Sequence, residues 1–501
     1  MIYMVKLTGQ NLIAGIPSSK GKQSYRSINP RTMKRSDIVF TDANREEIDS
    51  AFESAEHAFF KVKTGDIPDF LREVSNQILS LGDQLLEIAD NETALGVHRL
   101  KNERTRTCDQ LKKFADFIED DGYKEIVIDK SYSDINPSKP DIRRMLIPIG
   151  PAVVFPASNF PFAFGVCGGD SASAWAAGCP VIVKAHPSHP VTSEIFGHAV
   201  NKAIEICEFP RGYFSLIHGK DASVSEELVV HPKAEAIGFT GSQGAGRAIF
   251  DLASSRPRPI PVFAEMGSIN PIFIYNVKKD TAEQLANSIT LGVGQFCTKP
   301  GVIFLNKKHI VLIDEVIQIL RNIGSGILLN DSIKDNLTSK VLNSSKISSV
   351  DIRLGGCPLK DMVSFESTVM VTDMRTYLSN NVLHQEHFGP VALFVICEDG
   401  SDFLKIARYL EGQLTATIHV DISDSSCAMD LFNILTRKVG RLIINGVPTG
   451  VEVCEAMQHG GPYPATTAPH TTSVGMYAIK RFLRPISFQN VPEVLLPVEL
   501  R

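Results

Sequence analysis

The chain has 501 residues, of which 43% are hydrophobic and 21% charged, so we expect an ordinary globular protein with two or three domains. A formal net charge of −5 implies no strongly basic face and argues against a nucleic-acid partner. The sequence does not open with a basic start and an apolar segment, and no apolar run is long enough to cross a bilayer, so we predict a cytoplasmic protein without membrane contact.

The first part of the chain, residues 42–117, is predicted to be mostly helical. Apolar residues recur at helical intervals in REEIDSAFESAEHAFFKV and in LREVSNQILSLGDQLLEIADNETAL. A polar ribbon, KSYSDINPSKPDIRR, follows at residues 130–144 and separates this helical part from the rest of the chain.

Two blocks of alternating strand and helix patterns follow, and they predict an α/β fold. Between residues 143 and 275, helical spacing at 169–178, 190–207, 223–230 and 242–254 separates the strand candidates PAVVF, PVIVKAH, FSLIHG, AIGFTG, PVFAEMG and PIFIY. Between residues 270 and 445, a predicted helix at 281–293 precedes VIFL, VALFV, ATIHV and RLIIN. Such alternation is typical of parallel sheets covered by helices, which bind ligands beyond the carboxyl ends of their strands.

The last stretch, RPISFQNVPEVLLPV at residues 484–498, is rich in proline and apolar residues. A continuous apolar surface is unfavourable in water, so burial against a partner subunit explains this stretch better than exposure does.

Nine cysteines are scattered along the chain without a C-x-x-C pair, which argues against a disulfide framework or a zinc site and fits a reducing compartment. Prolines interrupt the H-x-x-H of His186 and His189, so we predict no metal site. We expect most cysteines to be buried and inert. Cys297, in GQFCTKPGV, differs because it follows a predicted helix end in a glycine-rich turn beside Lys299, and a nearby cation favours the nucleophilic thiolate.

Three further segments carry groups that could act with Cys297. Asn159, in FPASNFPFAF, could donate to a developing oxyanion or cap a strand end as an Asx turn. Glu265 ends an apolar strand candidate, where desolvation would raise its pKa and suit a general base, although it could also be a charge at the sheet rim. FTGSQGAG, at residues 239–246, offers backbone N–H groups to a phosphate or is simply a tight strand–helix turn.

Together these segments resemble the aldehyde dehydrogenase superfamily over nearly the whole chain. FTGS with its following glycine is similar to the family's cofactor turn, EMGSINP to its general-base segment, GQFCTKPG to its nucleophile segment, and EHFGP to its E-x-F-G-P segment. The resemblance implies two Rossmann-like parallel-sheet domains plus a small oligomerisation arm. It assigns residues 1–129 and 145–264 to a cofactor-binding domain, 265–465 to a catalytic domain, and 130–144 and 466–501 to the assembly of a homodimer or homotetramer.

The resemblance also implies a mechanism and a set of site residues. The Cys297 thiolate attacks the aldehyde carbon, Asn159 and the Cys297 N–H stabilise the oxyanion, hydride passes to a nicotinamide, and Glu265 activates the water that hydrolyses the thioester. The residues matched to cofactor binding are Pro156, Ser158, Lys184, Gly241, Ser242, Glu386 and Phe388. Pro187 stands where NAD-preferring relatives carry a glutamate, so we expect a preference for NADP, with NAD as the alternative cofactor.

Within the family, the segments around residues 158–190 and 445–475 resemble those of α-ketoglutaric semialdehyde dehydrogenases, which implies oxidation of 2,5-dioxopentanoate to 2-oxoglutarate. The alternative in the same branch is a long-chain fatty aldehyde dehydrogenase. The helix predicted at 102–118 resembles the one lining the family's substrate entrance. Arg106 on it could clamp a substrate carboxylate or be a solvated surface arginine, whereas Arg104 points elsewhere. Phe160 is expected in the substrate tunnel and suits either substrate.

Two alternative functions belong to other classes of protein. A cysteine hydrolase would pair Cys297 with one of the 13 histidines, although none stands in a recognised cysteine-hydrolase signature. A catalytically silent member of the fold would have no need of the intact set of Cys297, Glu265, Asn159 and Glu386.

Overall fold

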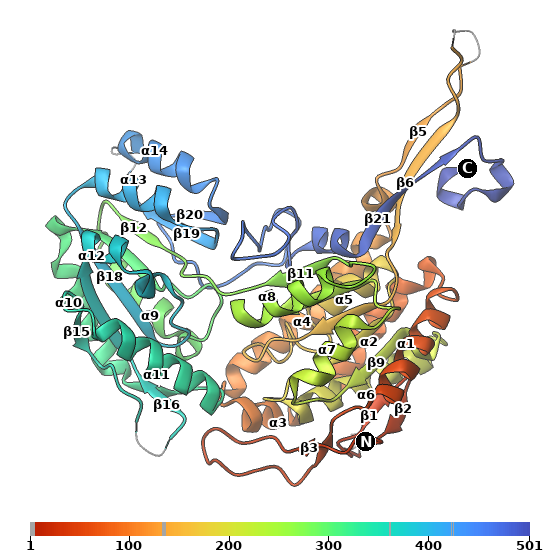
Figure 1. Ribbon diagram of the computed structural model, residues 1–501, viewed down its shortest axis with the longest axis horizontal. Coiled ribbons are helices and arrows are strands. Elements are labelled where there is room, and N and C mark those ends of the chain that lie inside the picture. The colour runs from red at the N-terminus through yellow and green to blue at the C-terminus, as the bar shows by residue number, and fades with distance from the viewer. Residues whose placement is uncertain (1–5, 133–136, 360–361, 422, 424) are drawn as a thin grey trace.

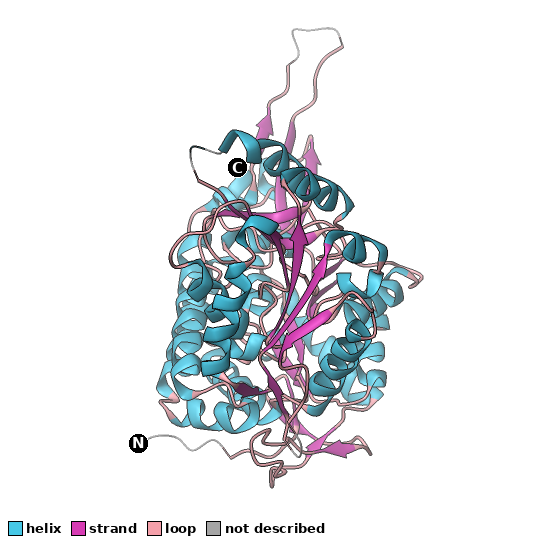
Figure 2. Ribbon diagram, turned by 90° about the vertical axis from the view of Figure 1, so that its left-hand side faces the viewer, coloured by secondary structure: helices cyan, strands magenta, loops and turns pink. Residues whose placement is uncertain are grey.

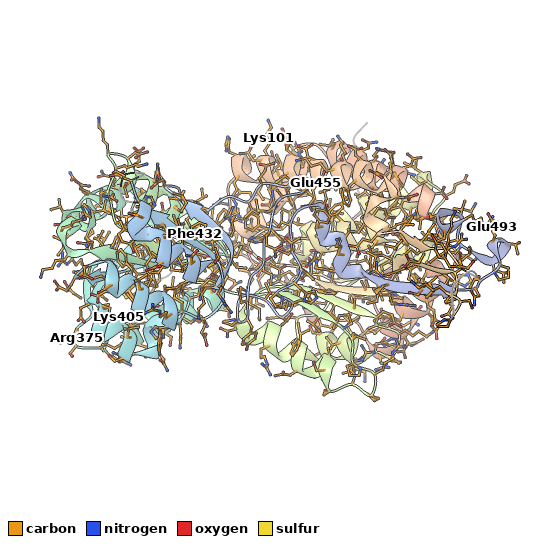
Figure 3. All side chains as sticks on the ribbon, turned by 90° about the horizontal axis from the view of Figure 1, so that it is seen from above. Lys101, Arg375, Lys405, Phe432, Glu455 and Glu493 are labelled. Carbon is orange, nitrogen blue, oxygen red and sulfur yellow. The ribbon has the colours of Figure 1, made fainter. Side chains whose placement is uncertain are left out.

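Two sheets, each covered by helices, organise the protein (Figures 1 and 2). The computed structural model describes residues 6–132, 137–359, 362–421, 423 and 425–501. Seen from above, the chain forms two lobes side by side, one around each sheet (Figure 3). The predicted α/β fold with two parallel-rich sheets is therefore confirmed.

The first sheet has the strand order β11-β10-β7-β8-β9-β1-β2 within the described residues. Its strands are β1 (Asn11–Ile13), β2 (Ile16–Ser18), β7 (Ala152–Phe155), β8 (Val181–Lys184), β9 (Phe214–Ile217), β10 (Ala236–Thr240) and β11 (Val262–Glu265). Strands β7 to β11 run parallel, and the first three of them are buried at every position, as expected of apolar runs covered on both faces.

Helices cover both faces of this sheet. They are α1 (Arg45–Phe59), α2 (Ile67–Ser80), α3 (Gln84–Thr93), α4 (Val97–Ile118), α5 (Gly169–Ala177), α6 (Pro190–Ile206), α7 (Ala222–Val230) and α8 (Gln243–Ser254). Alternate residues of β7 point to opposite sides: Val154 contributes to the core formed with α2, α4, α5 and α6, while Val153 contributes to the core formed with α1, α7 and α8. The period of two along the strand thus separates two cores.

The second sheet has the order β15-β17-β18-β13-β12-β19-β20 in the described part of the chain. Its strands are β12 (Ile272–Ile274), β13 (Val302–Asn306), β15 (Asp351–Leu354), β17 (Thr368–Asp373), β18 (Val391–Cys397), β19 (Gln413–His419) and β20 (Val439–Ile444). The covering helices are α9 (Thr281–Thr290), α10 (Val311–Ile323), α11 (Asp331–Ser345), α12 (Met374–Ser379), α13 (Gly400–Tyr409) and α14 (Ser425–Leu435). Short strand pairs outside the two large sheets are β3 (Ser24–Tyr25) with β4 (Phe40–Thr41), and β14 (Ser325–Ile327) with β16 (Ser364–Glu366).

One predicted helix is shorter than expected. The pattern at 281–293 predicts helix throughout, but α9 ends at Thr290 and a 3-10 turn, Leu291–Gly294, follows. Gly292 and Val293 in this turn have φ values of 55° and 57°, which a right-handed helix excludes. This backbone conformation is sterically unfavourable for Val293, whereas a glycine would adopt it without strain. The turn directs the chain into the segment that carries Cys297.

A three-stranded antiparallel arm projects from the first lobe (Figure 1). It consists of β5 (Val127–Asp129), β6 (Ile142–Pro148) and β21 (Leu483–Gln489), so the predicted polar ribbon and the carboxyl-terminal stretch meet in one sheet. Residues 133–136 of that ribbon lie outside the described residues. Val494, Leu495 and Val498 beyond β21 are 77%, 71% and 74% exposed in this single chain, and their burial against a partner stays a prediction.

No helix among the described residues is both long and apolar enough to cross a membrane. The cytoplasmic location expected from the sequence stays a prediction.

Candidate active site

The carboxyl ends of the parallel strands in the first sheet bring several predicted site residues to one edge. Thr240, the last residue of β10, is paired with Glu265, the last residue of β11, and Phe239 is paired with Phe155 at the end of β7. Pro156 and Gly241 directly follow these strand ends, and the edge is where α/β sheets bind ligands.

Cys297 lies in the loop between the 3-10 turn and β13, and hydrogen bonds fix the backbone of this loop. The side chain of Asn270 donates to the carbonyl oxygens of Cys297 and Lys299 at 2.7 and 3.0 Å. Gly294 has a φ of 66°, and a side chain there would collide with the backbone of Gly389, so the loop lies tightly against the EHFGP segment.

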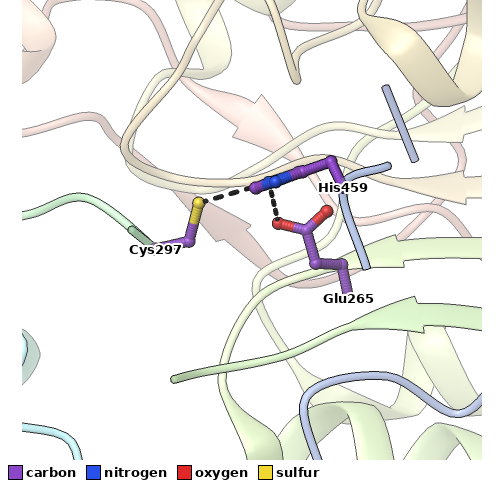
Figure 4. A group of neighbouring side chains, drawn as sticks. All are labelled: Glu265, Cys297 and His459. Carbon is purple, nitrogen blue, oxygen red and sulfur yellow. Dashed lines mark hydrogen bonds and ion pairs between the residues drawn. The ribbon is translucent and has the colours of Figure 1, made fainter. Parts of the chain in front are cut away.

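A histidine that the sequence did not single out joins the predicted nucleophile to the predicted base (Figure 4). Nε2 of His459 lies 3.6 Å from Sγ of Cys297 and 2.9 Å from Oε1 of Glu265. The hydroxyl of Ser473 donates to the other carboxylate oxygen of Glu265. The backbone N–H of His459 donates to Thr472 Oγ1 at 2.8 Å, which holds the histidine in place.

The Glu265 carboxyl differs from the sequence-based expectation. Burial raises its pKa, but the charge and hydrogen bond of His459 and the hydrogen bond from Ser473 lower it, and the net pKa lies below the ordinary value. The prediction of a raised pKa is therefore wrong, because it considered the apolar strand and not the partners supplied by the carboxyl-terminal part of the chain.

The sequence predicted that Lys299 favours the Cys297 thiolate, and the structure does not bear this out. Burial and the negative charges of Glu265 and Glu386 hold the pKa of the Cys297 thiol well above its usual value, with Arg106 acting in the opposite direction. The Lys299 ammonium instead donates to the carbonyls of His387 and Val391 at 2.9 and 2.7 Å. This lysine therefore ties the nucleophile loop to the segment after Glu386.

Asn159 is buried beside the nucleophile loop, where its amide donates to the carbonyl of Gln295 at 2.8 Å. The backbone carbonyl of Asn159 accepts a hydrogen bond of 2.6 Å from the guanidinium of Arg99 on α4. The Arg99 guanidinium lies 4.8 Å from the ring centres of both Phe160 and Phe296. Arg99 thus connects the predicted oxyanion donor to the residue that precedes Cys297.

The two arginines compared on α4 have different surroundings. Arg106 is half-buried, lies 5.5 Å from the ring centre of Phe164, and its charge acts on Cys297 and Glu265. Arg104 turns away, as predicted, and its guanidinium pairs with Asp83 at 3.2 Å. Phe160 contacts Phe296 with ring centres 5.0 Å apart, next to the nucleophile.

Several residues matched to cofactor binding lie at or just after strand ends of the first sheet. Lys184, which ends β8, is buried, and burial lowers its pKa to about 8. The N–H of Gly241 donates to the carbonyl of Glu265 at 3.1 Å, and Ser242 caps α8 by accepting from Ala245 N–H. Ser158 is half-buried in the loop after Pro156.

The Glu386 carboxylate occupies the space over Gly267, which lies two residues after Glu265, and any side chain there would collide with it. Burial raises the pKa of Glu386 to about 7, and the charge of Lys299 limits the rise. Phe388 is half-buried two residues further on.

The expectation that most cysteines are buried is only half right. Among the cysteines whose surroundings are described, Cys108, Cys167, Cys179 and Cys397 are buried, Cys207 and Cys297 are half-buried, and Cys357 and Cys454 are exposed. Cys297 alone among these shares a hydrogen-bonded cluster with a histidine and a carboxylate in the described part of the chain.

Comparison with known proteins agrees with this geometry. The model of the aldehyde dehydrogenase family matches residues 16–465. An α-ketoglutaric semialdehyde dehydrogenase 2 from Azospirillum brasilense is 40% identical, with 99% of this chain and 97% of the relative covered. An α-ketoglutaric semialdehyde dehydrogenase from Acinetobacter baylyi is 38% identical with the same coverage.

The fold also matches solved structures. A betaine aldehyde dehydrogenase from Staphylococcus aureus, crystallised with NAD+, superposes with a TM-score of 0.84 at 20% identity, covering 98% of this chain and 97% of that one. The resemblance drawn from the sequence, including its α-ketoglutaric semialdehyde dehydrogenase branch, is confirmed. The chain belongs to the aldehyde dehydrogenase family and is an aldehyde-oxidising oxidoreductase.

Proposed function

We propose that this enzyme oxidises 2,5-dioxopentanoate to 2-oxoglutarate with NADP as its preferred cofactor. The observation that carries the proposal is the contact of Cys297, His459 and Glu265 at the edge of the first sheet, with the charge of Arg106 acting on the same thiol. The two semialdehyde dehydrogenases named above support the choice of substrate.

His459 has a defined part in this mechanism. The raised pKa of the Cys297 thiol means that the thiol keeps its proton until a base removes it. The Glu265 carboxylate interacts with the thiol, so it can take this proton and release it to solvent, while His459 Nε2, 2.9 Å from Oε1, donates to the carboxylate and orients it. The thiolate then attacks the aldehyde carbon, and the amide of Asn159 with the Cys297 N–H donates to the oxyanion.

Hydrolysis of the thioester falls to Glu265. Its carboxylate is kept ionised by His459 and Ser473, so it can take a proton from water and direct the hydroxide at the thioester carbon. The product acid then leaves, and the thiol takes up a proton.

The residues at the sheet edge fit a nicotinamide dinucleotide. Within the described residues Lys184 forms no ion pair, so a buried ammonium is free to meet a ribose hydroxyl or a phosphate. The first turn of α8 after Gly241 offers backbone N–H groups to the pyrophosphate, and Glu386 would hold the nicotinamide ribose. A bound nicotinamide would supply the hydride acceptor for the oxidation. Pro187 places no carboxylate against a 2′-phosphate, which supports NADP over NAD.

The substrate carboxylate is assigned to Arg106. Burial lowers the pKa of this guanidinium, so its positive charge is held away from bulk water and close to the thiol. A planar guanidinium can bind a carboxylate with two parallel hydrogen bonds. A long-chain fatty aldehyde gives this charge no partner, which is why we rank that substrate second.

The remaining sequence-based assignments stay part of the proposal. Residues 1–129 and 145–264 form the cofactor-binding domain, residues 265–465 form the catalytic domain, and residues 130–144 and 466–501 join subunits into a homodimer or homotetramer. The arm and the exposed apolar residues after β21 support the last assignment.

The test is a steady-state assay with NADP that compares 2,5-dioxopentanoate with decanal for the wild type, Arg106→Ala and Arg104→Ala. Arg104→Ala is the matched control, since Arg104 lies on the same helix and pairs with Asp83. We expect Arg106→Ala to lower kcat/KM for the dioxo acid by about tenfold to a hundredfold and the control to keep it. A preference for decanal that is indifferent to Arg106 would assign the enzyme to fatty aldehydes.

A further inference from the structure

The cluster around Cys297 contains three different metal-binding atoms in a small volume (Figure 4). One ligand atom each from Glu265, Cys297 and His459 lies within 4.8 Å of the other two. Two of the separations are 3.6 Å between sulfur and Nε2 and 2.9 Å between Nε2 and Oε1. His459 and Glu265 are almost fully buried, so water competes little for these atoms.

We propose that Glu265, Cys297 and His459 form a binding site for a soft divalent cation, such as Zn²⁺, which inhibits the enzyme reversibly. Zinc accepts sulfur, imidazole nitrogen and carboxylate oxygen in tetrahedral geometry, with bonds of about 2.0 to 2.3 Å. Ligand atoms around such an ion lie about 3.3 to 3.8 Å apart, so the sulfur–nitrogen separation already fits and the nitrogen–oxygen pair must open slightly.

The charge balance favours a divalent ion. Binding forms a zinc–sulfur bond and releases the thiol proton to solvent, so a thiolate and the Glu265 carboxylate offset the two positive charges of the ion. His459 stays neutral and supplies nitrogen. The buried cluster then carries no net charge, which avoids the cost of an unpaired ion inside the protein.

Two features keep the site weaker than a structural zinc site. The positive charges of Arg106 and Arg441 act on Cys297 and oppose a cation. Nδ1 of His459 is buried without a hydrogen-bond partner in the described structure, so no second group fixes the imidazole. Hard cations such as Mg²⁺ prefer several oxygen ligands and should not bind here.

A bound ion would occupy the nucleophile, the carboxylate proposed to take its proton and the histidine that holds that carboxylate. Inhibition should therefore be competitive with the aldehyde and reversed by a chelator. The inference does not rest on the substrate or on the cofactor preference, because metal binding can be measured without turnover.

The experiment uses the full-length enzyme without cofactor and titrates it with Co²⁺, which takes similar ligands and gives a thiolate charge-transfer absorption band. We expect the band in the wild type, its loss in Cys297→Ser, and a weaker affinity by about tenfold or more in His459→Asn. The matched controls Cys454→Ser and His470→Asn change exposed residues and should keep the wild-type titration.

Zn²⁺ should displace Co²⁺ and bleach the band, whereas Mg²⁺ should not. Circular dichroism of each variant separates loss of a ligand from loss of the fold. The proposal is overturned by a folded wild type without the band, by a band that persists in Cys297→Ser, or by equal affinity in His459→Asn and the wild type.

Discussion

His459 and Glu265 form a buried pair, with Nε2 and Oε1 2.9 Å apart and side-chain exposures of 1% and 2%. A carboxylate buried alone would be protonated, because desolvation disfavours its charge. The imidazole and the Ser473 hydroxyl reverse that tendency and hold the pKa of Glu265 below its ordinary value. The base proposed for thioester hydrolysis is therefore charged across the physiological pH range.

The pH dependence of kcat should change when this pair is broken. His459→Asn removes a group that lowers the pKa of Glu265, so this pKa rises. On acidification, Glu265 of the variant is therefore protonated at a higher pH than Glu265 of the wild type. We expect the acidic limb of the kcat profile to move to higher pH, and kcat at neutral pH to fall by about a hundredfold or more.

The measurement is kcat against pH for His459→Asn, with His470→Asn as the control because His470 is exposed in the same carboxyl-terminal region. An acidic limb that coincides with that of the wild type would show that His459 does not set the charge of Glu265.

Replacing the nucleophile should abolish turnover without affecting cofactor binding. Cys297→Ala removes the sulfur but leaves the backbone hydrogen bond from Asn270 in place. We expect a loss in kcat of about a thousandfold or more, with an unchanged Kd for NADP in a fluorescence titration. Cys454→Ala, at an exposed position, should behave as the wild type. Normal turnover in Cys297→Ala would refute the thioester mechanism.

The sequence predicted what depends on local pattern. The buried strand β7 is a continuous apolar run, β8 is apolar up to its last residue, Lys184, and Glu265 falls at a strand end because the apolar run stops there. The helix predicted at 281–293 was wrong only at its carboxyl end, where Gly292 and Val293 adopt left-handed backbone angles that hydrophobic periodicity does not reveal.

What the sequence missed depends on contacts between distant segments. His459 lies 162 positions from Cys297 in a segment without regular secondary structure, so no spacing rule links the two. The predictions for the pKa of Glu265 and for the role of Lys299 were wrong for the same reason. The position of a residue at a strand end or beside another residue in the sequence does not reveal which carbonyl or imidazole from a distant segment contacts it.

Cofactor preference should respond to one charge near the adenine ribose. Pro187→Glu introduces a carboxylate in the loop after Lys184, where it repels a 2′-phosphate and can accept from ribose hydroxyls. We expect the ratio of kcat/KM for NADP over NAD to fall by about tenfold or more. Pro187→Gln is the matched control, since it has a similar shape without the charge. An equal effect of both variants would mean that the proline ring, and not the missing charge, sets the preference.

Arg99 should act on catalysis by positioning the groups around Cys297. Its guanidinium donates to the backbone carbonyl of Asn159 and lies over the rings of both Phe160 and Phe296, so it fixes the loop of the oxyanion donor against the nucleophile loop. Arg99→Met keeps much of the apolar stem but loses the hydrogen bond and the cation–π contacts. Because small displacements of reacting groups are costly, we expect kcat to fall by about tenfold to a hundredfold while the Kd for NADP is unchanged.

Arg104→Met tests whether this effect is specific to the site. Both arginines are on α4, but Arg104 pairs with Asp83 and does not approach Asn159. A positioning role predicts that Arg99→Met lowers kcat more than KM changes, and that Arg99→Lys, which cannot span the two rings, recovers little activity. If Arg104→Met lowered kcat as much as Arg99→Met did, the loss would come from a weakened α4 and not from the displaced Asn159.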